Sequence, residues 1–171
     1  METHLCLTLR PISIEDCAAI YAHISSQSTY FSNMYRWPSP YQEHDAQEFV
    51  ERALKEMEAE RGWHWAIIVE ELCGVISLYD IVGDGTAQLG YWVAKGHSGK
   101  GIASEALRQV LKMREVRRKI RAISTRVLED NIASIKVLEK YGFIVNKNKS
   151  RSVVVAGKPK NELLYVLYLD R

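Results

Sequence analysis

The sequence predicts an α+β (mixed α/β) fold: one central, mostly antiparallel, twisted sheet of about seven strands, with about four helices. Two observations lead to this prediction. Residues 63–94 contain three runs rich in Val, Ile and aromatic residues, separated only by short turn sequences, which is typical of an antiparallel meander. Residues 86–127 then show strand, glycine-rich turn, helix and strand patterns in succession, and this βαβ order requires a parallel strand pair.

The length and composition are those of one globular domain, which we expect to span residues 1–171. Three cysteines far apart in the sequence predict neither a disulfide framework nor a CxxC metal site, so we expect a reduced, cytoplasmic protein. The N-terminal residues lack a secretion-signal pattern, and no apolar run approaches the roughly 20 residues of a membrane span, so we expect no membrane partner. A net charge of +2 does not by itself indicate nucleic-acid binding.

Two elements are predicted at the start of the chain. Leucines alternate with polar residues from His4 to Arg10, as in a half-buried strand, and Pro11 breaks the pattern. Ser13 followed by Asp16 resembles a helix N-cap with a first-turn acid and predicts a helix to about Ile24. The apolar face expected for this helix consists of Ile14, Cys17, Ala18 and Tyr21.

Residues 25–41 are rich in aromatic residues and proline without a clear period. They fit equally well a substrate-facing wall or lid and a cluster that simply packs. From Asp45, apolar residues recur at helical spacing among charged ones, and Gly62 ends the pattern, so a surface helix is predicted.

The middle of the chain predicts strands at 63–69, 72–82 and 86–94, with turns at 70–71 and 83–85. A helix is predicted from Ala103 to about Arg117 and a strand over 120–127. A last helix follows at 131–141, with Gly142 as its C-terminal stop, and its apolar positions are Ile132, Ile135, Val137 and Leu138. Strands at 143–155 and 163–169 are expected to close the sheet as a hairpin over the loop 157–161.

The loop between the strand 86–94 and its helix carries three glycines, Gly96, Gly99 and Gly101. The first backbone N–H groups of a helix have no helical partner and lie at the positive end of its dipole, so this junction suits a phosphate group. Lys100 and Ser104 can add a positive charge and a hydroxyl donor. A tight turn without a ligand fits a lone glycine pair equally well.

Four segments together resemble the GNAT superfamily of acyl-CoA-dependent N-acyltransferases, in its RimJ/RimL-like branch, whose founding members acetylate the N-termini of ribosomal proteins. They are LTLRP at 7–11 with Asp16, GYWV at 90–93, GKGIASEA at 99–106 and NIASIKVLEKYGF at 131–143. The resemblance implies an N-acetyltransferase that moves an acetyl group from acetyl-CoA directly to an amine within a ternary complex. It implies acetyl-CoA as co-substrate and no metal, and no HExxH motif or cluster of histidines is found in the sequence.

The resemblance also implies which residues bind acetyl-CoA. The family motif Gln/Arg-x-x-Gly-x-Gly/Ala, which wraps the pyrophosphate in backbone amides, aligns with 98–103 and departs at its first position. The strand Tyr91-Trp92-Val93 would hold the pantetheine arm as if it were an added strand, and a bulge there would free an N–H to polarise the thioester carbonyl. The residues implied to bind acetyl-CoA are Tyr91, Trp92, Val93, Ser98, Gly99, Lys100, Gly101, Ile102, Ala103, Ser104 and Asn131.

The catalytic residues follow less directly. Many family members carry a tyrosine general acid seven residues after the Asn at 131, but this chain has Leu138 there. We therefore predict Ser134 as the group that protonates the leaving thiolate, and we expect Tyr141 to pack. Asp80 is the first candidate for the general base, ahead of Glu129 and Glu105, although each also fits a solvated surface acid. No cysteine lies in an activating context.

Two other functions fit parts of the sequence less well. Residues 99–104 approximate the GxGxxG dinucleotide fingerprint of an oxidoreductase, but Ser104 replaces the third glycine and only one βαβ unit is present. The basic run 112–121 prompts a nucleic-acid-binding module, but it has no interleaved aromatic residues, so a solvated helix end or a contact with the 3′-phosphate of CoA fits better. The acceptor stays open between a ribosomal-protein N-terminus, another peptide and a small amine. The protein is expected to be a monomer or homodimer.

Overall fold

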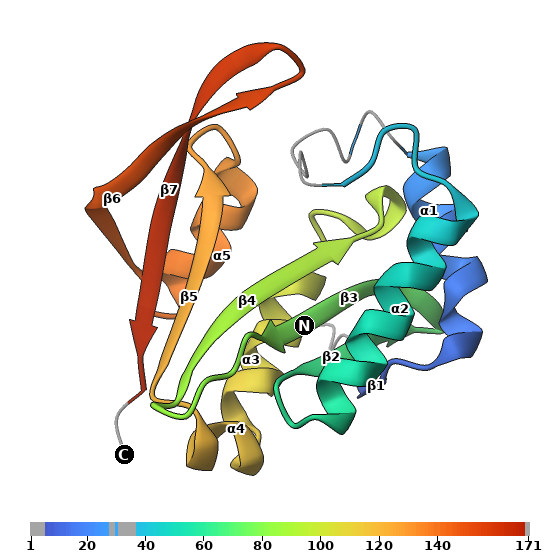
Figure 1. The fold of residues 1–171 in the computed structure, drawn as a ribbon, viewed down its shortest axis with the longest axis horizontal. Coiled ribbons are helices and arrows are strands. Elements are labelled where there is room, and N and C mark those ends of the chain that lie inside the picture. The colour runs from blue at the N-terminus through green and yellow to red at the C-terminus, as the bar shows by residue number, and fades with distance from the viewer. Residues whose placement is uncertain (1–5, 28–29, 31–36, 170–171) are drawn as a thin grey trace, which may run out of the picture.

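The computed structural model describes residues 6–27, 30 and 37–169. These residues form a seven-stranded sheet of order β1-β2-β3-β4-β5-β7-β6 (Figure 1), in which only β4 and β5 are parallel neighbours. The strands are β1 (Thr8–Pro11), β2 (Trp63–Val69), β3 (Glu71–Tyr79), β4 (Thr86–Val93), β5 (Ala122–Leu128), β6 (Ile144–Val155) and β7 (Lys158–Tyr168). The helices are α1 (Cys17–Ser26), α2 (Glu43–Glu58), α3 (Ile102–Lys112), α4 (Arg114–Lys119) and α5 (Ile132–Lys140). The predicted fold class, including the meander β2-β3-β4 and the βαβ unit, is confirmed.

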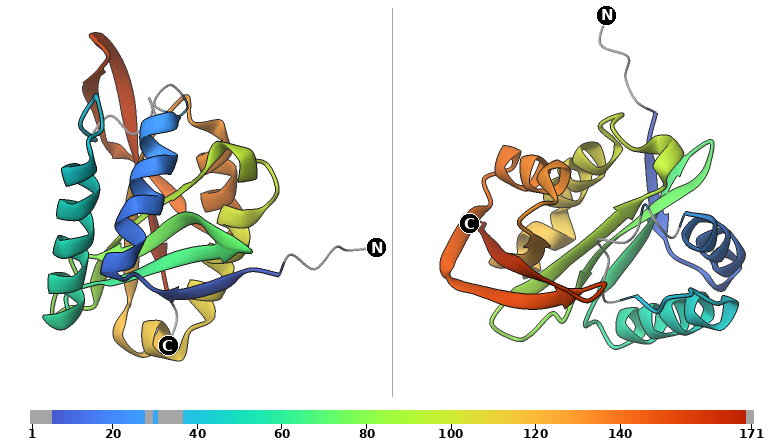
Figure 2. Two further views of the ribbon diagram at one scale, coloured as in Figure 1. Left: turned by 90° about the vertical axis from the view of Figure 1, so that its right-hand side faces the viewer. Right: turned by 90° about the horizontal axis from the view of Figure 1, so that it is seen from above.

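The helices lie in two layers, α1 and α2 on one face of the sheet and α3, α4 and α5 on the other (Figure 2). Successive side chains along a strand point to opposite faces of the sheet, so each strand contributes to the hydrophobic core on both faces. In β3, Val75 packs with the α1 and α2 layer while its neighbour Ile76 packs with α3, and both are buried. In the described part of the chain, no helix is long and apolar enough to cross a membrane.

Strands β4 and β5 pair only at their beginnings and then diverge, as Figure 1 shows. The paired residues are 86–88 with 122–124. Just beyond them, Thr125 Oγ1 donates to the backbone carbonyl of Leu89 at 2.9 Å, so the backbone groups of Leu89 point toward β5. Because these directions alternate along a strand, the N–H and C=O groups of Tyr91 and Val93 also point into the gap between β4 and β5.

The predicted face of α1 is correct only in part. Cys17 and Tyr21 pack against the core on this side of the sheet, as expected. Ile14 is 52% exposed and Ala18 is also exposed, whereas Ile20 and Ile24 are buried. The buried row is Asp16, Ile20 and Ile24, at i, i+4 and i+8. A buried acid starts this row, and a pattern of apolar residues alone does not reveal it.

The predicted helix from 103 to 117 is two helices, with an extended residue, Met113, between α3 and α4. Continuing the buried stripe of Leu107 and Val110 would place Arg114 and Arg117 against the sheet. The break avoids this burial of arginines and brings Val116, which is fully buried, into the core.

Three further predictions need correction. The second half of the last hairpin begins at Lys158 rather than at 163, so the connection is only Ala156 and Gly157. Pro11 belongs to β1, where it pairs with Trp65 at the sheet edge. Ile132, predicted as an apolar core position of α5, is 54% exposed and does not belong to the buried hydrophobic core. The predicted strand residues His4 and Leu5, and Phe31, Met34 and Tyr35 of the aromatic segment, lie outside the described residues.

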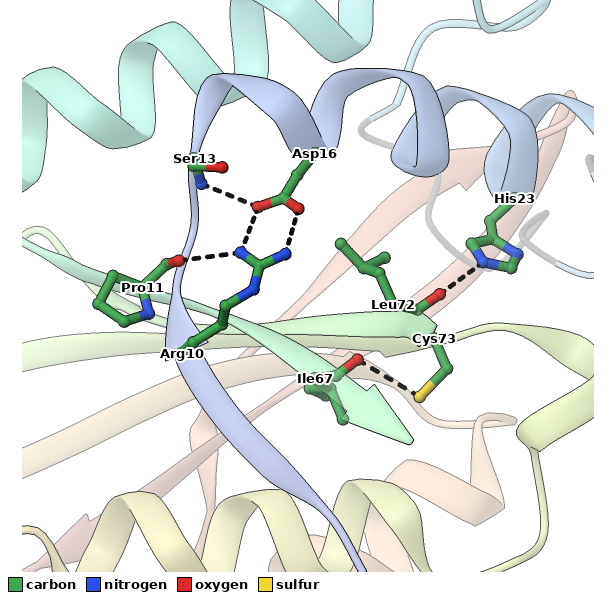
Figure 3. Close-up of polar contacts among 8 residues, drawn as sticks. All are labelled: Arg10, Pro11, Ser13, Asp16, His23, Ile67, Leu72 and Cys73. Atoms are coloured by element: carbon green, nitrogen blue, oxygen red, sulfur yellow. Dashed lines mark hydrogen bonds and ion pairs between the residues drawn. The ribbon is translucent and has the colours of Figure 1, made fainter. Parts of the chain in front are cut away.

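The turn from β1 into α1 is fixed by Arg10 and Asp16 (Figure 3). The Arg10 guanidinium donates to both carboxylate oxygens of Asp16, at 2.6 and 2.9 Å, and the backbone N–H of Ser13 donates to one of them at 2.8 Å. Burial acts to raise the pKa of Asp16, but these hydrogen bonds outweigh it and hold the pKa below its ordinary value of 3.8. Further along α1, His23 donates to the carbonyl of Leu72 at 2.8 Å and ties the helix to β3.

We expect Asp16→Asn to lower the free energy of unfolding by about 1–3 kcal/mol at pH 7, because the charged hydrogen bonds are lost. A carboxyl group whose folded pKa is depressed stabilises the fold above its unfolded pKa and stops doing so as pH falls through the folded pKa. The difference between wild type and variant should therefore be constant above about pH 4.5 and shrink below the ordinary value of 3.8. Urea denaturation from pH 2.5 to 7 tests this, with the exposed neighbour Glu15→Gln as control. An equal difference at pH 3 and pH 7 would contradict it.

Candidate active site

A groove of about 580 Å³ lies between the end of β4 and the N-termini of α3 and α5, and we call it the α3–α5 groove. Every residue predicted to bind acetyl-CoA lines it except Lys100, which is exposed outside it. Those lining residues are Tyr91, Trp92, Val93, Ser98, Gly99, Gly101, Ile102, Ala103, Ser104 and Asn131. Ser134 lines it as well. Residues 91–104 and 131–134, which are distant in the sequence, thus meet at one groove.

The glycine loop aims the start of α3 at this groove. Gly99 and Gly101 have φ of 74° and 78°, the left-handed region that favours glycine. The first helical hydrogen bond runs from the N–H of Glu105 to the carbonyl of Gly101 at 2.9 Å, so the amides of residues 102–104 lie ahead of the helical ladder. A Cβ on either glycine would meet no atom within 4 Å, so glycine is favoured at both positions by the backbone conformation and not by crowding. The same observation shows that there is open space beside the loop.

The bulge anticipated in the strand 91–93 is absent. The β3–β4 register is regular from Gly74 opposite Val93 to Tyr79 opposite Gln88. The backbone groups of Tyr91 and Val93 become available because β5 diverges, which sequence periodicity does not reveal. The structure therefore provides an open strand edge at the position predicted for the pantetheine arm.

Ser134 is engaged by two of the predicted residues. Its hydroxyl lies 2.6 Å from the hydroxyl of Tyr91, and its backbone N–H donates to Oδ1 of Asn131 at 3.3 Å. Asn131 is thus the N-cap of α5, the role its position alone suggested. Burial raises the pKa of Tyr91 to about 12, so its phenol stays protonated at neutral pH. The two hydroxyls form a neutral hydrogen-bonded pair facing the groove.

Tyr141 lies near a different part of the groove. Its hydroxyl is 3.1 Å from Oγ of Ser104, which also accepts a hydrogen bond from Lys140 at 3.0 Å. Tyr141 packs against the core on the α3 face and is not among the residues that line the α3–α5 groove. This arrangement favours the predicted packing role.

A second groove, of about 520 Å³, lies between α2 and β5, and we call it the α2–β5 groove. It shares four lining residues with the α3–α5 groove, namely Tyr91, Trp92, Asn131 and Ser134. The two grooves therefore meet where β4 and β5 diverge, and Ser134 stands at the junction. From the aromatic segment, Tyr30 lines the first groove and Trp37 the second, which favours the wall interpretation for these two residues.

The candidate bases are widely separated. Asp80 is exposed at the end of the α2–β5 groove and accepts a hydrogen bond from Gln88 at 2.8 Å. Hydrogen bonds from Arg108 lower the pKa of Glu105 to about 2, and neither Glu105 nor Glu129 lines either groove.

The basic run 112–121 begins at the C-terminal end of α3, whereas Gly101 is at its N-terminal end. None of the residues of this run lines either groove, so the suggested contact with CoA is not supported. In the described residues, no group of three His, Cys, Asp or Glu side chains could hold a metal ion.

Sequence reasoning missed two polar clusters in the α2–β5 groove. His64 lies between Glu56 and Ser77, with both of its ring nitrogens at 2.8 Å from an oxygen. Glu162 is 1% exposed and accepts a hydrogen bond from Arg151 at 2.6 Å. The available signal was one polar residue, His64, in the otherwise apolar strand β2. Glu162 gave no such signal, because it follows the polar residues at the start of β7.

Comparisons with known proteins fit this geometry. The protein family described as "Acetyltransferase (GNAT) domain" matches residues 7–144 of the 171. The probable N-acetyltransferase YjcK of Bacillus subtilis is 29% identical over 142 residues, covering 79% of this chain and 78% of YjcK. The ribosomal-protein-serine acetyltransferase of Escherichia coli is 28% identical over 144 residues, covering 81% of this chain and 79% of that protein.

Solved structures share the fold. RimL, the ribosomal L7/L12 alpha-N-protein acetyltransferase, in complex with coenzyme A, superposes with a TM-score of 0.84 at 19% identity, covering 96% of this chain and 94% of RimL. Spermidine N-acetyltransferase from Vibrio cholerae, in complex with CoA and spermine, has a TM-score of 0.80 at 19% identity, with 95% of each chain covered. At such identities the likeness establishes the fold alone.

Proposed function

The chain belongs to the acetyltransferase (GNAT) family and is an acetyl-CoA-dependent N-acetyltransferase, and from that premise we propose that it acetylates the terminal amine of a peptide or protein. In this proposal acetyl-CoA occupies the α3–α5 groove and the acceptor amine enters through the α2–β5 groove. The observation that carries the proposal is the meeting of the two grooves at Tyr91 and Ser134.

The α3–α5 groove has the chemistry that a CoA ester requires. The amides of residues 102–104 and the open space beside Gly99 and Gly101 suit the pyrophosphate. The unpaired side of β4 at Tyr91 and Val93 suits an extended amide chain. We assign these groups to acetyl-CoA binding. We assign Ser134 to protonation of the leaving thiolate, because its hydroxyl reaches the junction of the grooves.

The charges of the α2–β5 groove favour an acceptor with one positive charge over a polyamine. Its carboxylates are Glu56, Asp80 and Glu162, and it also contains two guanidinium groups, Arg52 and Arg126. Glu162 is hydrogen-bonded to Arg151, and Glu56 is hydrogen-bonded to His64. Asp80 accepts a hydrogen bond from Gln88, and His64 is neutral at pH 7, so Glu56 and Asp80 are both hydrogen-bonded to uncharged side chains. A nearly balanced groove offers little to a polycation but accommodates one ammonium group.

The relatives support the same choice. The Escherichia coli relative is named a ribosomal-protein-serine acetyltransferase, so a ribosomal-protein N-terminus is the first acceptor to test. The free state of Cys6, Cys17 and Cys73 is compatible with the cytoplasmic location that we propose.

An acceptor panel tests the proposal. We expect release of free thiol from acetyl-CoA with peptides that carry a free N-terminus, and at most weak release with spermidine or with N-acetylated copies of the same peptides. Acetyl-CoA should also raise the melting temperature, whereas NAD and single-stranded oligonucleotide should not. Efficient turnover of spermidine alone would replace the peptide proposal by a polyamine one. Stabilisation by NAD alone would contradict the assignment of the groove.

We expect Gly101→Ala to weaken acetyl-CoA binding by roughly 5- to 30-fold, because forcing a Cβ into the left-handed region costs about 1–2 kcal/mol and displaces the amides of the loop. Calorimetric titration measures the effect. Gly83→Ala is the matched control, because its Cβ also enters open space but its φ is not positive. Unchanged affinity in a folded Gly99→Val, Gly101→Val double variant would rule this binding site out.

A further inference from the structure

We infer that Ser77, His64 and Glu56 form a proton relay that removes the proton from the acceptor ammonium, with Ser77 as the residue that touches the amine. The inference rests on the proposed function, since it needs the amine in the α2–β5 groove. All three residues line that groove, although they come from three elements: α2, β2 and β3.

The three side chains form a continuous chain of hydrogen bonds. Ser77 Oγ lies 2.8 Å from His64 Nδ1, and His64 Nε2 lies 2.8 Å from Glu56 Oε2. His64 and Ser77 are only 5% and 6% exposed. Gly62 packs against His64 and Glu56, and a Cβ there would approach His64 Nε2 to 3.0 Å and Glu56 Oε2 to 3.3 Å. The cluster is therefore tightly fixed and its geometry is set by the fold.

The donor directions follow from the acceptors. A carboxylate only accepts, so the proton between His64 and Glu56 is carried by Nε2. Nδ1 is then the accepting nitrogen, and the hydroxyl of Ser77 donates to it. The lone pairs of Ser77 Oγ remain available to an N–H donor in the groove. Burial lowers the pKa of His64, while the hydrogen bond and charge of Glu56 act to raise it, so the imidazole is neutral at pH 7 and can take up a proton.

The relay ends beside the junction of the two grooves. Ser77 is paired with Gly90 on β4, which adds no side chain of its own, and the Tyr79 ring reaches to 3.3 Å from the position of a Gly90 Cβ. An amine lying over Gly90 would be one residue from Tyr91 and within about one strand spacing, 4.8 Å, of Ser77. Asp80, the base predicted from sequence, is three residues further along the chain, roughly 10 Å from Ser77 for an extended chain.

The charges around His64 determine how stable its protonated form, the imidazolium, is. Glu56, one turn further along α2 than Arg52, stabilises an imidazolium, and Arg52 opposes it. The aromatic ring of Phe49 meets the imidazole edge-on at 6.4 Å. Asp80 is the remaining carboxylate in this part of the groove.

The chemical step balances in protons. An ammonium N–H proton passes to Ser77 Oγ while the Ser77 hydroxyl proton passes to His64 Nδ1, which leaves a neutral amine and an imidazolium beside Glu56. The amine nitrogen then forms a bond to the acetyl carbon, the C–S bond breaks, and the thiolate takes the proton supplied through Ser134. Ser134 is restored by the second amine proton. After the product leaves, the imidazolium returns the Nδ1 proton through Ser77 to water in the groove, which restores the starting Nε2–H tautomer beside Glu56.

The test is the pH dependence of kcat, measured at saturating acetyl-CoA with a peptide acceptor identified by the panel. In wild type, kcat should level off above the pKa of His64, which lies below its ordinary value of 6.5. In Ser77→Ala and His64→Gln the amine must lose its proton to water first, so kcat should rise about tenfold per pH unit up to the amine pKa of about 8. Near pH 6.5 these variants should be at least about tenfold slower than wild type.

The controls separate the relay from a loss of structure. Ser77→Thr retains a hydroxyl and should keep the level profile. Glu56→Gln should lower kcat and move the acid limb to lower pH, whereas Glu58→Gln, an exposed acid on the same helix, should do neither. Level profiles in Ser77→Ala and His64→Gln would overturn the relay, and so would a tenfold slope confined to Asp80→Asn. Failure of wild type to acetylate any amine would instead refute the proposed function.

Discussion

Ser134→Ala is expected to lower kcat by roughly 10²- to 10⁴-fold, the range typical of lost general acid catalysis, and to leave acetyl-CoA affinity nearly unchanged. Ser134 lies at the junction of the two grooves, and its hydroxyl is 2.6 Å from that of Tyr91. Its partner has a pKa of about 12, so the pair can supply and recover a proton without a charge change before the step. Steady-state kinetics together with calorimetric titration of acetyl-CoA separate the two effects.

Tyr141→Phe is the matched comparison. Its hydroxyl contacts Ser104 at 3.1 Å rather than the junction, so the change in kcat should be less than about threefold. If Tyr141→Phe abolishes turnover and Ser134→Ala is mild, Tyr141 is the general acid and the assignment of Ser134 is wrong.

Leu138→Ala is expected to lower the free energy of unfolding by about 2–5 kcal/mol, the usual cost of truncating a fully buried leucine. Leu138 is the buried residue of α5, with no exposed surface, and it packs in the core on the α3 face. Because α5 also carries Ser134, loss of this anchor should lower kcat in addition to stability. Urea denaturation and initial rates measure the two consequences.

Ile132→Ala on the same helix is the control for stability. Apolar spacing predicts a core role for Ile132, but it is 54% exposed, so its truncation should cost less than about 0.5 kcal/mol. Equal losses in the two variants would show that α5 packs in a different register from the one described.

The glycine loop shows why part of the site can be predicted from the sequence. A left-handed φ at Gly99 and Gly101 and the start of α3 are local features, so residue type and spacing encode them directly. The open edge at Tyr91 and Val93 is different, because it depends on where β5 stops pairing with β4. The sequence predicts the strand at 91–93 and suggests a bulge as the source of a free N–H group. In the structure the free groups result from the divergence of β5 from β4.

The cluster of Glu56, His64 and Ser77 could not be predicted from the sequence for a similar reason. Glu56, His64 and Ser77 are separated by 8 and 13 residues, and they meet only through the register of β2 with β3 and the placement of α2. His64 alone looks like a polar exception in an apolar strand. In α1, likewise, Arg10 on β1 pairs with the buried Asp16, so apolar spacing found Cys17 and Tyr21 on the packed side but not the buried row that starts at Asp16.

We propose that acetyl-CoA and the acceptor amine enter by separate grooves and meet between β4 and β5. A crystal structure with coenzyme A and an acceptor peptide tests it most directly. We predict the pyrophosphate at the amides of residues 102–104, the pantetheine along Tyr91 and Val93, and the peptide N-terminus in the α2–β5 groove beside Ser77. Coenzyme A bound away from the glycine loop, or both ligands in one groove, would show that the two grooves do not have these roles.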